Sequence, residues 1–458
     1  MSRIFVIGIA LFVIVNADAG EPTKKKSPPS EPEGLKALQH PDARVRYRAA
    51  QTLADLGPTA KFALPELREA LKDKNTQVRV KAVEAIWKID PPPVSSLMPT
   101  LLAALKDADA NGRAAAPPVI ALFGTKAKPA VPALIDTLKD PKLNVKLSAI
   151  TALGEIGPTA KSAAQPLLDL ADDKEFFLME PFVGAALANL GATIVPTLAD
   201  ALMHKSAERR QVAAYALGAM GSASASATDA LVAAIGHADP NTRRSAAIAL
   251  GKVGSSARSV LPSLLKSVAD KEVAVRIESA VALWRVTGDH SHASHLIKIL
   301  SDPSPDARDA ACQALATMKG AAKDAVKPLI TLLNDKELRV RTITTLGAIG
   351  TDAKVALPEL NKGLKDKDAE AQLLSAYAVW QITGETKETL PIIENALASE
   401  SLDRQAAHLL GEMGAAAQPS LRTLIAIYRE DDDARFRQAI AAAIKKIDPQ
   451  MAMKLGIR

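Results

Sequence analysis

The clearest set of potential metal ligands in this sequence of 458 residues is a short histidine cluster. His290, His292 and His295 follow directly after Asp289, and three imidazoles with a carboxylate could hold zinc or copper. The cluster falls between two of the repeating segments described below, where nothing in the sequence fixes the geometry of the ligands. We therefore expect no native metal site here and no cofactor.

The only cysteine, Cys312, is the one thiol that could act as a nucleophile. It lies in Ala-Ala-Cys-Gln-Ala-Leu, among apolar neighbours, and no histidine stands in the same helical stretch to activate it. The zinc-protease H-E-x-x-H, the G-x-S-x-G elbow and the phosphate-binding G-x-x-x-x-G-K-[ST] are all missing. We therefore expect a protein that is not an enzyme.

The elements that would position any site come from a repeat. Similar units begin at residues 34, 67, 101, 134, 167, 198, 231, 264, 296, 329, 360, 393 and 421, a mean period of about 32 residues. Each unit has an apolar stretch of helical spacing, a break at Asp-Pro or Asp-Lys, and a second Ala/Leu-rich amphipathic stretch that usually ends in Leu-Gly-x-Ile-Gly. The pattern predicts an all-α solenoid of about thirteen helix–turn–helix repeats.

Two polar positions recur within the unit. A basic residue at the thirteenth position should approach an aspartate of its own or the adjacent unit, which would give a ladder of charge-assisted hydrogen bonds. The aspartate stands at the turn, where it can accept backbone N–H groups at the start of the second helix. The aspartates are Asp73, Asp107, Asp140, Asp173, Asp270, Asp302, Asp335 and Asp366. The basic residues are Arg46, Arg79, Arg113, Lys146, Arg210, Arg243, Arg276, Arg308 and Arg341. His40, His204 and His237 occupy the aspartate position, so we interpret them as turn residues.

The pattern L-x-x-L-x-D-x-x-x-x-V-R-x-x-A-x-x-A-L-G-x-I-G resembles the HEAT-like repeats of the phycobilisome-lyase type. The resemblance covers nearly all of residues 34–458. It implies a right-handed superhelix whose second helices line a concave face that binds other macromolecules. Some HEAT-like proteins act as di-iron hydroxylases through repeated His-Glu pairs, but no His-Glu dipeptide occurs here.

One unit, residues 167–197, departs from the pattern. It places Pro181 in its second helix, with Phe176, Phe177 and Phe182 close by. These rings could form an apolar docking patch for a partner, or they could pack into the core of their own unit. The preceding unit carries Pro117-Pro118, which we expect to break or kink its second helix.

Three tryptophans stand where other units have the glycine of Ala-Leu-Gly. They are Trp87, Trp284 and Trp380. A large ring near the end of the second helix could cover the junction to the next unit or bind a ligand. We favour packing, because tryptophan is usually mostly buried.

The first residues have the composition of a targeting segment. Residues 1–19 combine Arg3, an apolar run and Ala17-Asp18-Ala19, as a cleaved signal peptide does. An uncleaved anchor is the alternative, but the run is too short to span a bilayer. Residues 20–33 form a Pro/Lys-rich linker, and residues 34–458 the solenoid. We expect an exported protein, periplasmic or secreted, with no integral membrane segment after cleavage.

The net charge of +6 is a mild excess for this length. No basic stripe with interleaved aromatic residues occurs, so we expect no nucleic acid partner. An anionic polymer of the cell envelope stays possible through summed electrostatics.

Three functional hypotheses remain. The first is a non-enzymatic exported scaffold, expected to be monomeric, that binds a protein partner through the concave face. The second, which follows from the resemblance alone, is a lyase-type or chaperone-like subunit that handles a tetrapyrrole or an acceptor protein. The third is a binder of an anionic envelope polymer.

Overall fold

A computed structural model describes residues 31–457, and every regular element in that range is a helix. The chain divides into two compact units, Met1–Val260 and Leu261–Arg458. Helices α2 to α27 form thirteen pairs, each a short helix followed by a longer one, so the predicted all-α solenoid is confirmed. The expected signal peptide and most of the expected linker lie outside the described residues.

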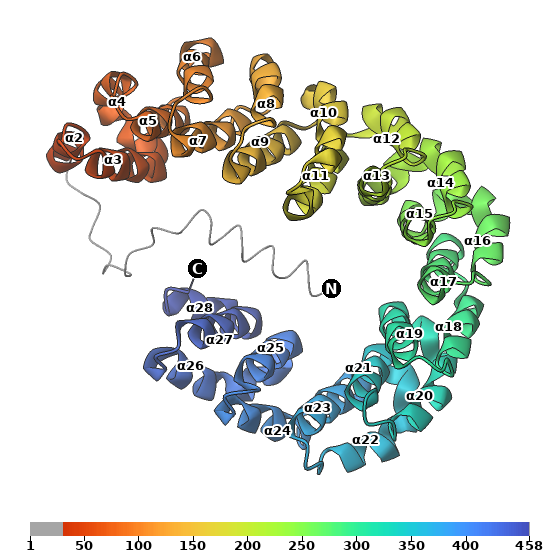
Figure 1. Cartoon of the computed structure of the whole chain (residues 1–458). Coiled ribbons are helices and arrows are strands. Elements are labelled where there is room, and N and C mark those ends of the chain that lie inside the picture. The colour runs from red at the N-terminus through yellow and green to blue at the C-terminus, as the bar shows by residue number, and fades with distance from the viewer. Residues whose placement is uncertain (1–30, 458) are drawn as a thin grey trace. The chain divides into compact units, whose positions relative to one another are not determined.

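In the first unit, the long helices lie side by side in one layer and the short helices in another (Figure 1). The long helices are α3 (Ala43–Leu56), α5 (Thr76–Ile89), α7 (Ala110–Ala121), α9 (Leu143–Ile156), α11 (Phe176–Asn189), α13 (Ala207–Met220) and α15 (Pro240–Val253). The short helices are α2 (Glu31–Leu38), α4 (Leu64–Ala70), α6 (Val94–Ala104), α8 (Val131–Thr137), α10 (Ala164–Asp169), α12 (Val195–Ala201) and α14 (Thr228–Ile235). Helix α2 begins three residues before the predicted start of the solenoid at Gly34.

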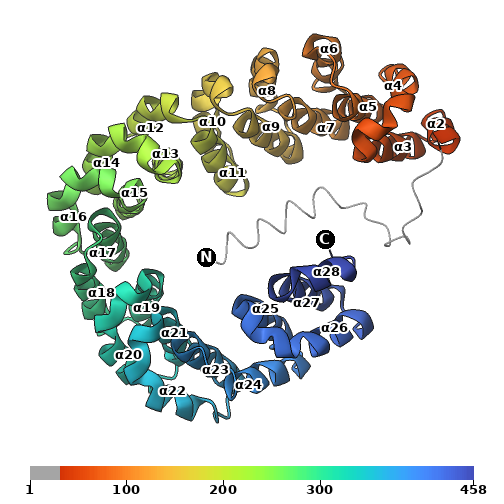
Figure 2. The same ribbon diagram turned by 180° about the vertical axis from the view of Figure 1, so that it is seen from behind.

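The second unit repeats these two layers, as the reverse view also shows (Figure 2). Its long helices are α17 (Val273–Thr287), α19 (Pro305–Met318), α21 (Arg339–Ile349), α23 (Ala369–Thr383), α25 (Asp403–Met413) and α27 (Ala434–Ile447). Its short helices are α16 (Leu261–Ser267), α18 (Ala293–Ile299), α20 (Val326–Leu332), α22 (Leu357–Gly363), α24 (Thr389–Asn395) and α26 (Leu421–Glu430), and α28 (Pro449–Lys454) packs on α27.

A stretch of 3-10 helix joins most long helices to the next short one, a feature that the repeat pattern did not predict. In η3 (Gly157–Ala163) it opens at Gly157, whose φ of +70° ends α9 in a conformation that other residues rarely adopt. The equivalent stretches are η1 (Gly57–Ala63), η2 (Gly124–Ala130), η6 (Gly221–Ala227), η7 (Gly254–Val260), η9 (Lys319–Ala325), η10 (Gly350–Ala356) and η12 (Gly414–Ser420). Two shorter ones, η5 (Ala192–Ile194) and η8 (His290–His292), hold the same place, whereas η4 (Leu170–Asp172) and η11 (Ala396–Ala398) follow the short helices α10 and α24.

The glycine of Ala-Leu-Gly lets consecutive long helices approach closely. A Cβ atom on Gly154 of α9 would stand 2.8 Å from the Cα atom of Ala186 on α11. A Cβ on Gly347 of α21 would stand 2.9 Å from the Cα of Ala378 on α23. Backbone atoms cannot move aside for such a contact, so glycine at this position sets the spacing of the layer.

The three tryptophans occupy this same position, and each is half-buried. Trp87 packs against Phe123 with 4.5 Å between ring centroids, and Trp380 against Tyr377 with 5.3 Å. Helix α23, which carries Trp380, barely touches α25, whereas α21 with α23 and α25 with α27 pack closely. Helices α5 with α7 and α17 with α19 are also more loosely packed than the other neighbouring long helices of their own units. Within each unit, a tryptophan at the glycine position thus marks the loosely packed pairs.

The expected break at Pro117-Pro118 is wrong. Helix α7 runs without interruption from Ala110 to Ala121 across both prolines, and α11 likewise continues through Pro181. Both prolines of α7 stand in its second half. There the Leu122 amide still donates to the Pro118 carbonyl, so the helix continues to its usual end.

Between residues 31 and 457, no single helix has the length and apolar character needed to cross a membrane. The segments Phe176–Asn189 and Ala192–Ala201 reach that length only when taken together, and they meet at an angle of 106°.

Candidate functional site

The predicted ladder residues lie along the turns between short and long helices. The structure brings each of six basic residues onto the turn aspartate of the following repeat. The pairs are Arg46–Asp73, Arg79–Asp107, Arg113–Asp140, Lys146–Asp173, Arg276–Asp302 and Arg308–Asp335. In each arginine pair the same guanidinium also donates to two backbone carbonyls of its own turn, as Arg46 does to His40 and Pro41. Each such arginine therefore closes one turn and ties it to the next.

The turn aspartate binds a backbone N–H group within the turn, just before the long helix, and not the N–H groups of the helix itself. Asp73 accepts the backbone N–H of Asn75, and it is the Asn75 side chain that caps α5 by accepting from Val78. Asp140 likewise accepts from Lys142, the residue before α9. The aspartate therefore orders the turn that presents the cap, and a second residue caps the long helix in several repeats.

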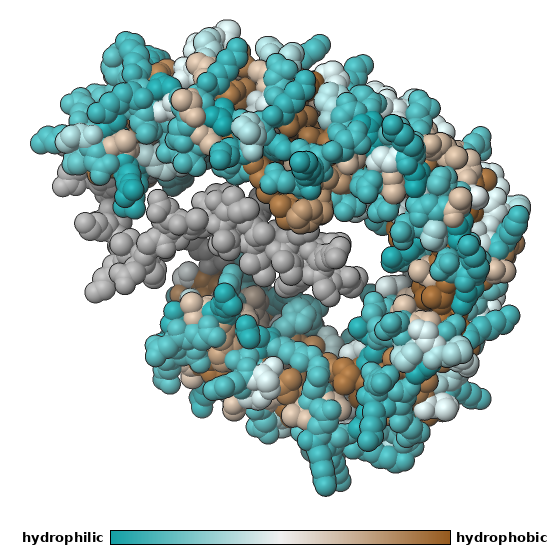
Figure 3. Space-filling model, viewed as in Figure 1, coloured by the Kyte–Doolittle hydropathy of each residue, from teal (hydrophilic) through white to brown (hydrophobic). Residues whose placement is uncertain are grey.

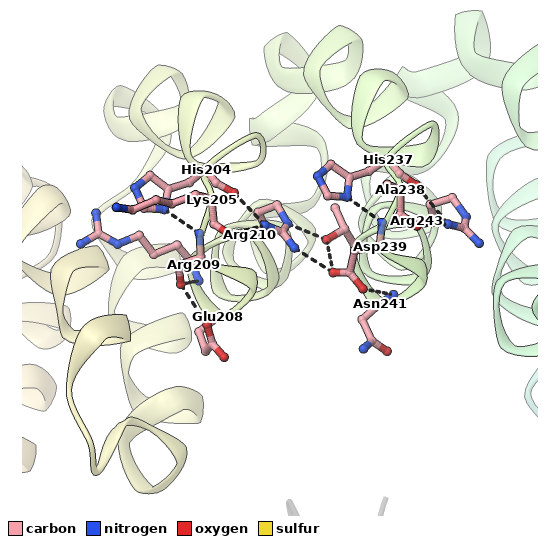
Figure 4. Close-up of polar contacts among 12 residues, drawn as sticks. His204, Lys205, Glu208, Arg209, Arg210, His237, Ala238, Asp239, Asn241 and Arg243 are labelled. Atoms are coloured by element: carbon pink, nitrogen blue, oxygen red, sulfur yellow. Dashed lines mark hydrogen bonds and ion pairs between the residues drawn. The ribbon is translucent and has the colours of Figure 1, made fainter.

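The histidine turns use the same geometry with a different acceptor. Nδ1 of His204 accepts from the Ser206 amide, and Nδ1 of His237 accepts from the Asp239 amide (Figure 4). His237 has no carboxylate to pair with Arg210. The Arg210 guanidinium instead pairs with Asp239 at 2.9 Å and donates a hydrogen bond to the Thr242 hydroxyl at 2.7 Å. Arg243 donates to the carbonyls of His237 and Ala238.

Arg341 does not take its expected place. Its Nε lies 2.8 Å from Asp309 of the preceding repeat, and Arg339 pairs with the turn aspartate Asp366 instead. Helix α21 begins only at Arg339, so its first turn differs from that of the other long helices. Asp270 orders its own turn by accepting from the Glu272 amide.

These pairs hold the turn carboxylates in the charged form. Burial opposes the ionisation of Asp73 and Asp140. Hydrogen bonds from Arg46 and Arg113, backbone amides of Asn75 and Lys142, and nearby positive charges together outweigh burial, so the pKa of each carboxyl is lowered. At Asp239, hydrogen bonds from Thr242 and Arg210 outweigh burial and lower the pKa to about 2. The ladder is therefore a stabilising element whose charged groups are already paired with one another.

A groove lies on the long-helix layer of the first unit and encloses about 400 Å³. Its floor is α7, because that helix presents the small residues Ala114 and Ala115 with Pro118 between larger side chains of its neighbours. Two of the helices that line it, α5 and α7, are the loosely packed pair at Trp87. The groove is lined by Tyr47 of α3; Gln77, Val80, Lys81 and Glu84 of α5; Asn111, Ala114, Ala115, Pro118 and Val119 of α7; and Asn144, Leu147, Ser148 and Thr151 of α9.

The two charged residues of the groove neutralise one another. Lys81 Nζ lies 2.6 Å from Glu84, and Lys88 Nζ lies 2.6 Å from the other oxygen of the same carboxylate. Burial opposes the ionisation of Glu84, but the hydrogen bonds from both lysines outweigh it and lower the pKa of the carboxyl. Lys81 also stands over the ring of Tyr47, 5.2 Å from its centroid. Each charged group on this side of the groove is thus paired, and the cluster of Lys81, Glu84 and Lys88 carries one net positive charge.

Three side-chain amides follow one edge of the groove. Gln77, Asn111 and Asn144 are each the second residue of their long helices. Within the part of the chain that the structure describes, none of these three side chains has a hydrogen-bond partner. Each amide offers two donors and one acceptor oxygen. We call these three residues the amide row.

Phe177 continues the amide row, since it is the second residue of α11. Its side chain is 71% exposed, and Leu178 beside it is 42% exposed. Figure 3 shows apolar residues gathered at the place where Figure 1 labels α11. The neighbouring Phe176 is 5% exposed and belongs to the core, and Phe182 is half-buried. The three phenylalanines therefore do not form one patch: only Phe177 stands free on the surface.

The other residues with possible chemistry are placed as structural groups. Asp289 caps η8 by accepting from the Ser291 amide, and no three His, Cys, Asp or Glu side chains of residues 31–457 are grouped to hold a metal ion. Cys312 is fully buried, and burial together with nearby Asp309 raises the pKa of its thiol to about 11.

Sequence reasoning missed the groove. Its signal was present at one repeat position, which holds Gln77, Asn111, Asn144 and Phe177 in consecutive units. A second signal was Glu84, a carboxylate within the apolar stretch Ala82–Ile86. Neither pattern shows the groove itself, because the groove forms where the small side chains of α7 lie between larger side chains of the neighbouring helices.

The chain belongs to the HEAT-repeat family. The family model described as HEAT repeats matches residues 31–99, 98–178, 195–284 and 293–380. The matched ranges include all helices of the groove. The match indicates no catalytic family. It identifies HEAT repeats in general and does not distinguish the phycobilisome-lyase subtype.

Solved structures of similar fold include two karyopherins and an engineered protein. Kap95p, whose binding induces the switch loops of RanGDP to adopt the GTP-bound conformation, aligns at 13% identity and a TM-score of 0.51 over 91% of this chain and 67% of its own. Kap121p bound to Pho4p aligns at 15% identity and a TM-score of 0.47 over 98% of this chain and 58% of its own. The engineered protein aligns at 20% identity and a TM-score of 0.33 over 77% and 98%.

The chain spans about half the length of most of the Kap121p structures it aligns with. No curated protein sequence matches it.

Proposed function

We propose that this chain is a non-enzymatic scaffold that binds a protein partner through the groove on the long helices α3 to α9. The observation that carries the proposal is the groove itself, whose edge holds three amides without a partner among the described residues. The exposed Phe177 stands at the same repeat position on the next long helix, α11. Hydrogen-bonding groups next to an exposed aromatic side chain are typical of protein-binding surfaces. A HEAT-repeat fold supports the same function, since Kap95p acts on a protein, RanGDP.

The alternative of an anionic polymer is less well supported. Its binding would require free cations, but the ladder arginines pair with aspartates and with backbone carbonyls. The side chains of Arg46, Arg113 and Arg308 are only 7%, 15% and 17% exposed. The lyase-type alternative rests on the sequence resemblance, and no observation on the described residues favours it over a protein partner.

The scaffold function can be tested by capture and by mapping. The full chain with a C-terminal tag is expressed in its source cells and crosslinked mildly, and captured proteins are identified at two salt concentrations. We expect one salt-resistant protein in near-stoichiometric amount, lost from the variant Asn111→Ala/Asn144→Ala and kept by Asn241→Ala. Asn241 is the second residue of α15 and lies outside the groove. Equal capture by all three proteins would contradict binding at this site.

Export is part of the same proposal and has its own test. The mass of the protein recovered from the cell envelope and from the medium should correspond to a chain that begins at Gly20. A full-length mass confined to the cell interior would contradict export without affecting the groove.

A further inference from the structure

We infer that the groove binds an extended, uncharged, proline-rich segment of the partner protein in the polyproline II conformation, with three residues of the segment for each long helix. The inference rests on the proposed function and names the chemistry of the occupant. It follows from the spacing of the amide row, the charge of the lining and the aromatic residues at the two ends.

The spacing of the amide row fits this conformation. Packed helices lie about 8–10 Å apart, and a polyproline II chain rises about 3.1 Å per residue with three residues per turn, or about 9.3 Å per turn. At that spacing, one face of such a segment would meet Gln77, Asn111 and Asn144 at matching intervals. A β-strand presents the same face every second residue, about 6.6–6.8 Å, and would fall out of step by the second helix.

The hydrogen-bonding groups also match. A polyproline II segment has no internal hydrogen bonds, so its backbone carbonyls are free to accept. Each amide of the row has N–H groups to donate and no partner on the described residues. Proline removes the backbone N–H of the segment, which leaves carbonyls as the backbone groups that must be satisfied.

The lining offers no unpaired charge to an occupant, although Lys88 outside the lining shares the Glu84 carboxylate and gives the cluster one net positive charge. Lys81 and Glu84 are the two charged residues of the groove, and they pair with each other at 2.6 Å. Their side chains are 13% and 11% exposed, so neither is free to meet an opposite charge on a partner. A charged segment would lose its hydration without gaining a counter-charge, whereas proline and alanine carry no such cost.

The ends of the groove suit apolar side chains. Tyr47 stands at the α3 end, and Phe177 continues the amide row on α11, where 71% of its side chain is exposed. Between them, the small residues Ala114 and Ala115 leave room for proline rings. From α5 to α11 there are three helix intervals, about 24–30 Å, which corresponds to about nine residues of polyproline II.

The test uses fluorescence anisotropy of the full chain with a fluorescein-labelled peptide of sequence (Ala-Pro-Pro)4. We expect saturable binding that changes little between low and moderate salt, and much weaker binding of a (Gly-Ser)6 peptide of the same length. The variant Asn111→Ala/Asn144→Ala should weaken binding by about tenfold or more, because two hydrogen bonds are lost. Phe177→Ala should also weaken it, and Asn241→Ala should leave it unchanged. The thermal unfolding midpoint of each variant shows that the protein is folded.

Each outcome decides something. Equal binding of both peptides, or binding that Asn111→Ala/Asn144→Ala leaves unchanged, would overturn the inference. An unlabelled peptide of residues 20–33 serves as a competitor and is compared with unlabelled (Ala-Pro-Pro)4. If the peptide of residues 20–33 displaces the probe more strongly, the occupant is this chain's own Pro-rich segment, and the assignment to a partner is overturned. Failure to bind (Ala-Pro-Pro)4 by a chain that still captures a protein through the groove would overturn the inference alone. Failure of both experiments would overturn the proposed function as well.

Discussion

Arg46 and Asp73 form a bidentate ion pair between residues 27 positions apart, with 2.5 Å from Nε to Oδ2 and 2.8 Å from Nη2 to Oδ1. Both side chains are less than a tenth exposed. The same spacing of 27 residues recurs at Arg113–Asp140 and Arg308–Asp335. The regular repeat therefore gives several of these ion pairs the same separation in sequence.

Removing one partner of the first pair should destabilise the protein. Asp73→Ala leaves the Arg46 guanidinium buried and removes the acceptor for the Asn75 amide, so we expect a loss of about 2–4 kcal/mol in the free energy of unfolding. Urea denaturation of the full chain measures this loss. Glu69→Ala is the control, because its pair with Lys72 is about three-quarters exposed and should matter by less than about 0.5 kcal/mol. Equal losses in the two variants would show that burial of the pair is unimportant.

The ladder should make stability depend on acid pH. The pKa of Asp239 in the folded protein is about 2, below the value of about 3.9 in an unfolded chain. The charged form therefore favours folding, so the contribution is complete above pH 4 and is lost as the pH falls from about 4 to about 2. We expect Asp239 to contribute about 1–2 kcal/mol after allowance for solvent screening. Unfolding midpoints measured from pH 7 down to about pH 2 follow the trend, and the fall should be smaller in Asp239→Asn.

Phe176 is buried and its neighbour Phe177 is exposed, so alanine substitutions at the two positions should differ in their effect on the free energy of unfolding. Phe176→Ala removes a buried ring and should cost about 3–5 kcal/mol. Phe177→Ala should change the free energy of unfolding by less than about 0.5 kcal/mol, because its ring is mostly in solvent. Thermal and urea unfolding of the two variants would give similar losses if both rings packed in the core.

The glycine position of the long helices should not tolerate a methyl group. Gly154→Ala places a Cβ 2.8 Å from a backbone atom of α11, and we expect a loss of about 1–3 kcal/mol although alanine favours helices. Gly236→Ala is the matched control, since its closest contact would be an ordinary 3.4 Å. A stabilised Gly154→Ala protein would refute close packing at this position.

Cys312 should react with thiol reagents only after unfolding. At pH 8 a thiol with a pKa of about 11 has roughly a hundredfold less thiolate than an ordinary cysteine, and its burial adds a further barrier. The rate of reaction with a disulfide reagent in buffer and in urea measures the difference. Fast labelling in buffer would place the thiol on the surface.

The repeat made much of this fold predictable, since the period of about 32 residues and its Asp and Arg positions are visible in the sequence. The pairing of Arg341 could not be predicted, because α21 begins only at Arg339 and no residue type indicates this shift of its first turn. Local propensity favours a break at Pro117-Pro118, but α7 is continuous through both prolines. The groove could not be predicted, because it depends on the relative heights of side chains from four helices.

The tryptophans have a mechanical consequence. Long helices that meet at glycine share a stiff backbone contact, whereas those that meet at Trp87, Trp284 or Trp380 are joined through side chains. Within each unit, bending strain should therefore concentrate at the helix pairs that these tryptophans join. One of these joints, between α5 and α7, runs along the floor of the groove, so the width of the groove should respond to force applied along the chain.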